Sequence, residues 1–342
     1  MSRGYAESEN NFTLLRLLLA LMVVVGHFKL LSGTVRPDFP FNLAGAAVDC
    51  FFVVSGFLIA LSYERSRDVW AFYVRRIFRI YPMYVCVVLV QTAILLSLLP
   101  NGPLSAPEAT LRYLAANLVM ANFLQYDIGG TLNHLPTPGI NPSLWTLKIE
   151  LGFYLIVPLI ILAVRRWGWL VLAFIFLASA GYAAFTTDPR LARQLPGQLQ
   201  FFVVGMAFAL FRQPVRLHPL VSIAVGLVFF VSWSYWRIIP PGICPLIVGA
   251  FVYCFAFCTP VVPMRHDLSD RVYLLHAPLL QTLILLHLFH DNLLFLSGVL
   301  VTVLSYAALS ELAVERPGIA FGHKLARMVQ QRRVQVGGPS VA

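Results

Sequence analysis

The sequence predicts an all-α, polytopic integral membrane protein with about ten transmembrane helices and cytoplasmic N- and C-termini. Hydrophobic residues make up 59% of the 342-residue chain and charged residues only 12%, and the mean hydropathy is +0.77. A soluble domain carries about 25% charged residues, so most of this surface does not face water. The apolar residues also form runs of about 17–25, the length that crosses a bilayer core.

The apolar runs define the predicted spans. We place them at about 12–31, 44–62, 80–99, 143–164, 168–186, 198–211, 219–237, 243–259, 272–290 and 293–313. The first run carries Arg16, His27 and Lys29 and is not followed by a small-residue cleavage site, so we interpret it as a retained span and not as a signal peptide. Segment 111–124 is short and contains one arginine and two asparagines, which favours an interfacial or re-entrant helix.

Basic residues set the predicted orientation, because cytoplasmic loops carry an excess of Lys and Arg. With the N-terminus inside and 111–124 not crossing, seventeen basic residues lie in the cytoplasm: Arg3, Arg65, Arg67, Arg75, Arg76, Arg79, Arg165, Arg166, Arg212, Arg216, Arg265, Arg271, Arg316, Lys324, Arg327, Arg332 and Arg333. Six lie outside: Lys29, Arg36, Arg112, Arg190, Arg193 and Arg237. This asymmetry explains the net charge of +10 without a nucleic-acid partner.

Two parts of the chain lie outside the predicted spans. The extracytoplasmic stretch 100–142 is rich in Pro, Gly and Asn, and it forms either a lid or binding wall or a plain connector. Residues 1–320 are predicted to form the membrane domain, and residues 321–342 a basic, disordered cytoplasmic tail. The five cysteines fall in apolar runs without metal-ligand spacing, so we predict buried thiols and no metal site.

Ionisable residues inside the spans are candidates for function, because each costs about 2.5–3.5 kcal/mol to insert at the centre of a helix. Arg16 and His27 are eleven residues apart, which places them within about 20° on one helix face and roughly 16 Å apart. That face would carry a cation near the cytoplasm and an imidazole near the outer side. Alternatively, Arg16 reaches toward lipid headgroups and His27 bonds a neighbouring carbonyl.

Glu150 lies about two turns into the fourth predicted span, at a depth similar to that of His27. A carboxylate can hold an imidazole in one tautomer and stabilise its protonated form, which makes the histidine an effective general base. We therefore predict a His27–Glu150 pair, with an ion pair of Glu150 to Lys148 or Arg16 as the alternative. Ser143 is seven residues earlier on the same face and would either bind substrate or cap the helix.

A run of arginines leads into the third span from the cytoplasm. Arg76 and Arg79 are three residues apart, and Arg75 and Arg79 are four apart, so their guanidiniums can converge on one anion. Arginine forks match phosphate oxygens. These side chains would therefore bind a phosphate-bearing ligand, or else anchor the helix to lipid headgroups.

These motifs, in this order, resemble the bacterial acyltransferase-3 family, integral-membrane O-acyltransferases that modify cell-surface glycans. Val48-Asp49-Cys-Phe-Phe-Val-Val-Ser55-Gly56-Phe57 is similar to a family signature, and so are Arg75-Arg76-Ile-Phe-Arg79-Ile-Tyr-Pro82 and the Ser143-Leu-Trp145 element that precedes Glu150. The Arg16–His27 span resembles the opening span of the family. Weaker similarities are Tyr273-Leu-Leu-His276-Ala-Pro278 and Glu315-Arg-Pro317.

The resemblance implies a reaction and roles for named residues. Family members take an acyl group, usually acetyl, from cytoplasmic acyl-CoA and place it on a hydroxyl outside the cytoplasm. His27 would be the catalytic base and Glu150 its acidic partner, and Ser143 and Trp145 would bind substrate. The implied acyl-CoA-binding residues are Arg16, Arg75, Arg76, Arg79, Asp49 and Ser55. Many relatives carry a second acidic residue directly after the glutamate, where this chain has Leu151.

The sequence thus predicts a multi-pass protein of the bacterial inner membrane that transfers an acyl group, with acetyl favoured, from acyl-CoA to a hydroxyl of an exported sugar. An exopolysaccharide or lipopolysaccharide unit is the expected acceptor, and a macrolide-type secondary metabolite is the alternative. A transporter or flippase of a lipid-linked glycan is the alternative from another class. Transporters often contain inverted repeats, and no repeat is visible here. The sequence leaves the oligomeric state open.

Overall fold

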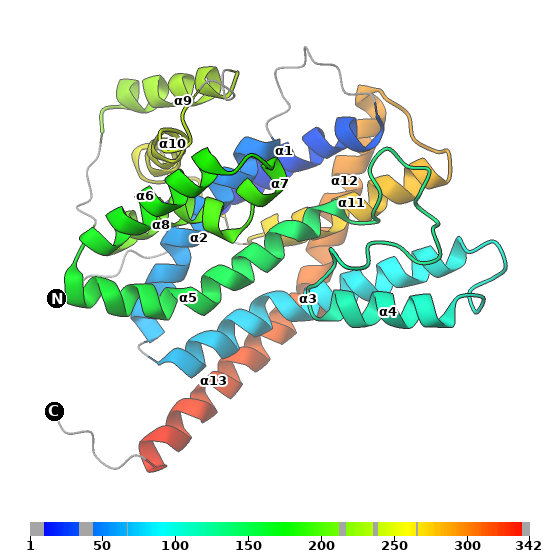
Figure 1. The fold of residues 1–342 in the computed structure, drawn as a ribbon, viewed down its shortest axis with the longest axis horizontal. Coiled ribbons are helices and arrows are strands. Elements are labelled where there is room, and N and C mark those ends of the chain that lie inside the picture. The colour runs from blue at the N-terminus through cyan, green and yellow to red at the C-terminus, as the bar shows by residue number, and fades with distance from the viewer. Residues whose placement is uncertain are drawn as a thin grey trace. The chain divides into compact units, whose positions relative to one another are not determined.

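The computed structural model describes residues 10–33, 44–66, 68–211, 217–234, 239–264 and 266–336. Over these residues the regular structure is helical and contains no β-strand, which confirms the all-α class (Figure 1). The helices are α1 (Phe12–Leu31), α2 (Ala44–Ser66), α3 (Val69–Ser97), α4 (Pro107–Leu118), α5 (Trp145–Trp167), α6 (Leu170–Phe185), α7 (Pro189–Ala192), α8 (Leu195–Leu210), α9 (Pro219–Ser234), α10 (Cys244–Cys258), α11 (Ser269–Leu285), α12 (Leu293–Ser310) and α13 (Arg316–Val336). A 3-10 turn, η2 (Pro142–Leu144), precedes α5, and a π-helical turn, η3 (Glu311–Glu315), joins α12 to α13.

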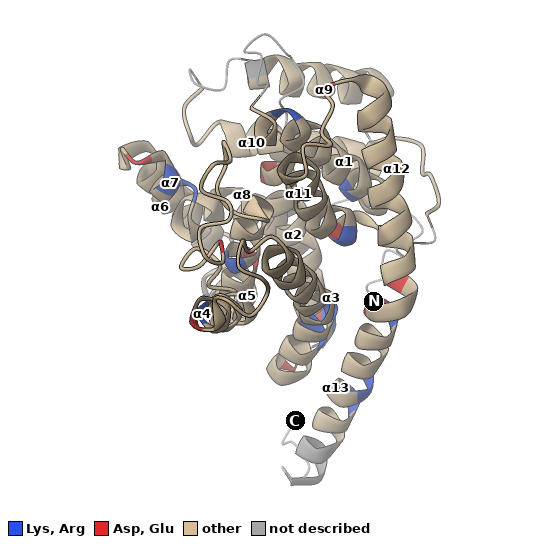
Figure 2. Ribbon diagram, turned by 90° about the vertical axis from the view of Figure 1, so that its right-hand side faces the viewer, with Lys and Arg blue, Asp and Glu red and all other residues tan. Residues whose placement is uncertain are grey.

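Each of the ten apolar runs corresponds to a helix. Within the described residues, five helical segments are long and apolar enough to cross a membrane: Phe12–Leu31, Ala44–Ser66, Val69–Ser97, Pro142–Trp167 and Leu293–Gln331. Helices α6, α9 and α10 are apolar but shorter. Charged residues are sparse on most of the ribbon (Figure 2). The structure therefore indicates a multi-pass membrane protein, whereas the number of ten crossings and the orientation of the termini stay predictions. Seven basic residues used for that orientation lie outside the described residues: Arg3, Arg36, Arg67, Arg212, Arg216, Arg237 and Arg265.

Helix α3 begins eleven residues before the predicted span at 80–99. Asp68 caps its N-terminus, because the carboxylate oxygen Oδ1 accepts a hydrogen bond from the backbone N–H of Ala71 at 2.6 Å. The arginine run therefore lies within the first turns of a continuous helix and not in a loop that precedes one.

The stretch 100–142 is an ordered segment built around α4. Pro107 stands at the helix start, where its missing N–H costs nothing. With twelve residues, α4 is too short to cross a bilayer, as the sequence predicts for segment 111–124. The segment is tied to α11, where Gln281 Nε2 donates hydrogen bonds to the carbonyls of Thr137 at 2.9 Å and Gly139 at 3.0 Å.

The chain divides into two compact units. Unit 1 comprises Met1–Val23, Asp38–Arg65 and Ile149–Ser269, and unit 2 comprises Val24–Pro37, Ser66–Lys148 and Asp270–Ala342. Four of the boundaries fall inside helices: near the middle of α1, after the fourth residue of α5, before the last residue of α2 and after the first residue of α11. Helices α1 and α5 therefore contribute several residues to each unit.

In unit 1, α2 and α8 make a close backbone contact through two glycines. A Cβ atom added to Gly56 would lie 2.0 Å from the carbonyl oxygen of Phe202, and one added to Gly205 would lie 1.9 Å from the carbonyl oxygen of Val53. Only glycine permits this approach, which is typical of small residues at membrane helix interfaces. Phe202 also stacks on Phe153 of α5, with ring centroids 3.9 Å apart. Gly56 of the Ser55-Gly56-Phe57 motif therefore has a packing role.

In unit 2, α13 runs alongside α3 (Figure 1). Gly318 and Gly322 of α13 face Pro82 and Phe78 of α3, and a Cβ atom added to Gly322 would lie 2.5 Å from Phe78 Cβ. This packing accounts for the helix that the structure describes at residues 321–336, where the sequence predicts a disordered tail. Residues 337–342 lie outside the described part of the chain.

We expect Gly56→Ala to destabilise the protein by about 1–3 kcal/mol or more, because the methyl group overlaps the Phe202 carbonyl and forces α2 and α8 apart. The matched control is Gly181→Ala on α6, where an added Cβ meets nothing within 4 Å and the loss of glycine's backbone freedom should stabilise the helix by about 0.5–1 kcal/mol. Thermal unfolding in detergent measures both. Equal midpoints for the two variants would contradict the α2–α8 contact.

Candidate active site

Unit 2 brings together two histidines and a serine from three elements. His27 comes from α1, Ser143 from η2 and His276 from α11. His27 Nδ1 lies 2.7 Å from His276 Nε2, and the two rings meet edge to edge, with centroids 5.0 Å apart and planes inclined by 27°. Ser143 Oγ lies 3.4 Å from His27 Nδ1 and 3.3 Å from His276 Nε2. His276 and Ser143 are fully buried, whereas His27 is half-buried.

Local hydrogen bonds hold Ser143 in place. Asn141 caps η2 by accepting a hydrogen bond from Ser143 N at 3.3 Å, and its Nδ2 donates to the carbonyl of Leu274 on α11 at 2.9 Å. Tyr273 OH donates to the Ser143 carbonyl at 3.3 Å and lies 2.9 Å from Thr146 Oγ1. Since Asn141 provides the cap, the Ser143 hydroxyl is directed at the imidazoles and not at the helix start.

The second ring nitrogen of His27, Nε2, makes no hydrogen bond to any described residue. A histidine held at one nitrogen, with its other nitrogen open, has the arrangement that a general base requires. The partner at Nδ1 is His276, which the sequence marks only through the weak Tyr273-Leu-Leu-His276 similarity.

Glu150 lies on α5 within unit 1, where its Oε1 accepts a hydrogen bond from Tyr154 OH at 2.5 Å. His27 belongs to unit 2, so the His27–Glu150 pair stays a prediction. Lys148 lies in unit 2, and its Nζ sits 4.6 Å from the centroid of the Phe123 ring, a cation–π contact between α5 and the 100–142 segment.

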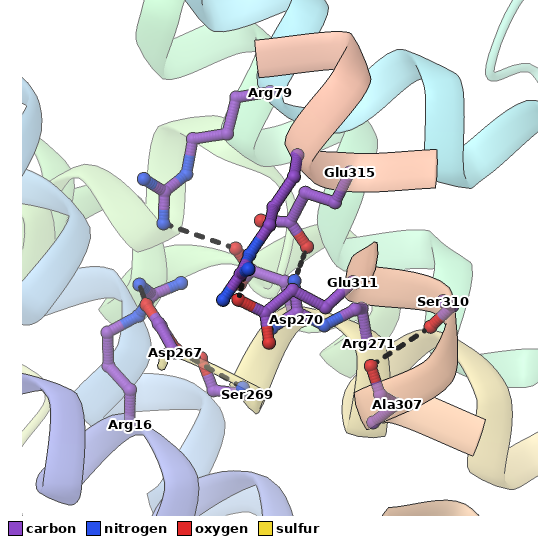
Figure 3. A network of polar contacts seen from close by, with 11 residues as sticks. Arg16, Arg79, Asp267, Ser269, Asp270, Arg271, Ala307, Ser310, Glu311 and Glu315 are labelled. Carbon is purple, nitrogen blue, oxygen red and sulfur yellow. Dashed lines mark hydrogen bonds and ion pairs between the residues drawn. The ribbon is translucent and has the colours of Figure 1, made fainter. Parts of the chain in front are cut away.

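Arg16 forms an ion pair with Asp267 in unit 1 (Figure 3). The side chain of Arg16 is 10% exposed, and the Asp267 carboxylate also accepts a hydrogen bond from Ser269 Oγ at 2.5 Å. A buried guanidinium needs a fixed anion, and here the anion is separated from Arg16 by 251 positions in the chain.

The arginine run on α3 is held by neighbours in unit 2. Arg75 donates to Ser66 Oγ, and Arg79 NH2 lies 3.4 Å from Asp270 Oδ2 (Figure 3). Helix α13 places His323 within electrostatic range of Arg75 and Arg76 of α3, and also of Arg327 on α13 itself. The cations of α3 and α13 thus form one basic region, which suits a polyanionic ligand.

A second charged cluster in unit 2 surrounds Arg271, the residue after Asp270 (Figure 3). Its side chain is 1% exposed and forms an ion pair with Glu315, and its NH2 lies 3.7 Å from Glu311 Oε2. Both carboxylates come from the π-helical turn η3, in which the N–H of Arg316 donates to the carbonyl of Glu311, five residues earlier. This wider turn ends two residues before Pro317, which lacks an N–H and so cannot donate to the helical hydrogen-bond ladder. The sequence alone predicts Arg271 only as a basic residue of a cytoplasmic loop.

The remaining residues predicted for the site are Asp49, Ser55 and Trp145. Asp49 and Ser55 lie on α2 and are half-buried, and Asp49 is within electrostatic range of Arg193 in the same unit. Trp145 begins α5 and is half-buried. The five cysteines are free thiols. No cluster of metal-ligating side chains occurs among the residues for which the structure gives positions.

Arg271→Ala should destabilise the protein by about 3–5 kcal/mol, because it leaves the carboxylates of η3 buried without their cation. The control is Arg112→Ala on α4, whose ion pair with Glu108 is 65% and 77% exposed at its two side chains and should contribute less than about 1 kcal/mol. Chemical denaturation in detergent compares them. A loss no larger than that of Arg112→Ala would show that the cluster does not stabilise unit 2.

Comparison with known proteins identifies the family. The family model described as an acyltransferase domain matches residues 9–311. An O-acetyl transferase of Shigella phage Sf6 is 31% identical over 87% of this chain and 92% of the relative. A nodulation protein of Rhizobium leguminosarum bv. viciae is 34% identical, but the match spans only 50% of each chain. A putative membrane-bound transacylase of Komagataeibacter xylinus is 26% identical over 81% of this chain and 77% of its own length.

No solved structure matches the chain significantly. The family match covers α1 to the start of η3 and so includes the histidine pair, Ser143 and the arginine run. The chain belongs to the acyltransferase-3 family and is an acyltransferase.

Proposed function

We propose that the protein is a membrane O-acyltransferase that moves an acetyl group from acetyl-CoA to a hydroxyl of an exported sugar, with His27 as the general base. The observation that carries this proposal is the geometry of His27, whose Nδ1 is held by His276 and Ser143 while Nε2 has no hydrogen bond to the described residues. The phage relative, an O-acetyl transferase, supports acetyl as the acyl group and oxygen as the acceptor atom.

In the proposed reaction, His27 Nε2 removes the proton from the acceptor hydroxyl while the hydroxyl oxygen attacks the thioester carbonyl. The new C–O bond forms as the C–S bond breaks, and the protonated imidazole returns its proton to the departing thiolate. Atoms and charges balance without a metal or a redox step. General base catalysis of this kind contributes about 10²–10⁴-fold to the rate. Glu150 is proposed as an acidic partner that favours the imidazolium, in keeping with the family resemblance.

The basic region of α3 and α13 is proposed to bind the CoA phosphates. Arg75, Arg76 and Arg79 provide planar guanidiniums that match phosphate oxygens, and Arg16, Asp49 and Ser55 are proposed to line the path of the acyl-CoA. Ser143 and Trp145 are proposed to contact the acceptor or the acyl group. Because the chain spans only half the length of the nodulation relative, nothing about the acceptor is taken from that protein, and the sugar acceptor is proposed from the family resemblance.

The topology proposed for this reaction has ten spans, both termini inside and the location in the bacterial inner membrane. The excess of Lys and Arg in the predicted cytoplasmic loops supports this orientation. It places the α3 arginines on the side where CoA is made and His27 toward the side where an exported glycan would arrive. A macrolide-type acceptor would use the same donor and base. The molecule that receives the labelled acetyl group distinguishes it from a sugar acceptor.

His27→Ala should abolish transfer of labelled acetyl from acetyl-CoA to a glycan extract by the purified protein in nanodiscs. The expected loss is at least about 10²-fold in kcat, because no other group would accept the hydroxyl proton. The control is His218→Ala, which removes an exposed imidazole and should leave the rate unchanged. A His27→Ala enzyme with the rate of the unmodified protein would refute the proposed base.

Arg76→Ala should raise the KM for acetyl-CoA by about 10- to 150-fold with kcat nearly unchanged, because one charged hydrogen bond to a phosphate contributes about 1.5–3 kcal/mol. Acetyl-pantetheine, which carries the thioester without the nucleotide phosphates, should be used equally well by the variant and the unmodified protein. Arg112→Ala serves as the control for removing one positive charge. Equal KM values for acetyl-CoA in Arg76→Ala and Arg112→Ala would remove Arg76 from the donor site.

A further inference from the structure

We propose that His276 is a positioning residue that fixes the tautomer of His27, so that the proton sits on Nδ1 and the lone pair on Nε2. This inference deepens the proposed function and rests on it only for its catalytic consequence. The hydrogen-bond chain itself lies within unit 2 and runs from the Val272 carbonyl through both imidazoles to His27 Nε2.

The first link fixes the protonation of His276. Its Nδ1 lies 3.1 Å from the backbone carbonyl oxygen of Val272, one turn earlier on α11. A carbonyl oxygen can only accept a hydrogen bond, so His276 Nδ1 must carry the proton of the neutral ring. His276 is fully buried, and a buried imidazole without a carboxylate partner is favoured in its neutral form. The remaining nitrogen, Nε2, is therefore an acceptor.

The hydrogen bond between the two imidazoles then determines which nitrogen of His27 carries the proton. His276 Nε2 and His27 Nδ1 are 2.7 Å apart, a distance at which two lone pairs would repel each other and one proton must lie between them. Since His276 Nε2 carries no proton, the proton belongs to His27 Nδ1. A neutral imidazole has one N–H, so the free nitrogen of His27 is Nε2, and it is basic.

The position of Ser143 agrees with this assignment, given that His276 Nε2 carries no proton. The hydroxyl lies 3.4 Å from His27 Nδ1 and 3.3 Å from His276 Nε2. If it bridges the two rings, it accepts the proton of His27 Nδ1 and donates its own to His276 Nε2. In both arrangements His27 is protonated at Nδ1.

The neighbours of His276 are arranged to keep the ring in place. The Tyr273 ring lies with its centroid 6.0 Å from that of His276 in an edge contact, and its hydroxyl bonds the backbone of Ser143 and Thr146 Oγ1. Partners of this kind, which orient a reacting histidine without touching substrate, affect the rate through the geometry and tautomer of that histidine.

Two substitutions of nearly equal size separate the positioning role from a purely structural one. In His276→Gln, the side-chain carbonyl can occupy the place of Nε2 and accept the proton of His27 Nδ1. In His276→Asn, the amide reaches only the place of Nδ1, so it preserves the contact with Val272 and loses the contact with His27. We expect His276→Gln to retain most activity and His276→Asn and His276→Ala to lose about 10–100-fold in kcat, with the KM for acetyl-CoA unchanged.

The tautomer is measured directly by ¹⁵N NMR of histidine-labelled protein in bilayers at neutral pH, with the His27 signals assigned as those missing from His27→Asn. We expect His27 to be protonated at Nδ1 in the unmodified protein and in His276→Gln, and to shift toward Nε2 protonation in His276→Asn. An unchanged tautomer in His276→Asn and His276→Ala, or an active His276→Asn beside an inactive His276→Gln, would overturn the proposal. Because this spectrum needs no acyl transfer, an expected spectrum together with an active His27→Ala enzyme would refute the base and leave the hydrogen-bond chain intact.

Discussion

The contact between the imidazoles of His27 and His276 constrains the rest of the site. Polar groups in apolar helices are costly unless they are paired, and this contact satisfies one nitrogen on α1 and one on α11 at 2.7 Å. It also explains the surrounding polar residues. Ser143 needs a hydrogen-bond partner because it is fully buried, and Tyr273 and Asn141 hold its backbone, so the local network is closed except at His27 Nε2.

The same rule accounts for the charged groups elsewhere in each unit. In unit 1, Arg16 is neutralised by Asp267. In unit 2, Arg271 is surrounded by the carboxylates of the π-helical turn η3, which are brought into place by a widened helix next to Pro317. These pairs place each buried guanidinium beside a carboxylate, whereas Arg75 and Arg76 of α3 lie within electrostatic range of His323 of α13. A phosphate-bearing donor is the ligand that we propose for this basic region.

The sequence predicts the helices and the site residues that stand out locally. It does not predict the partners of those residues, and the reason is physical. Hydropathy alone places α1 at Phe12–Leu31, because a membrane helix is a local property of about twenty residues. His27 and the arginine run are likewise visible as unusual charges in an apolar chain. Their partners are not, since His276 and Asp267 are 249 and 251 positions away, and one sequence carries no record of such contacts. Residues 321–342 are predicted as a tail because they are basic and end in a Gly-Gly-Pro sequence, whereas the structure describes a helix as far as Val336, which packs on α3 through Gly318 and Gly322.

A structure of the protein bound to a non-transferable thioether analogue of acetyl-CoA tests directly whether His27 Nε2 faces the reacting thioester, as we propose. We expect the carbonyl carbon within about 6 Å of Nε2, which leaves room for one hydroxyl in hydrogen-bond reach of the base and in near-attack distance of the carbon. We also expect the nucleotide phosphates against the α3 arginines. An acyl end bound away from His27, or one that approaches Nδ1, would contradict the account.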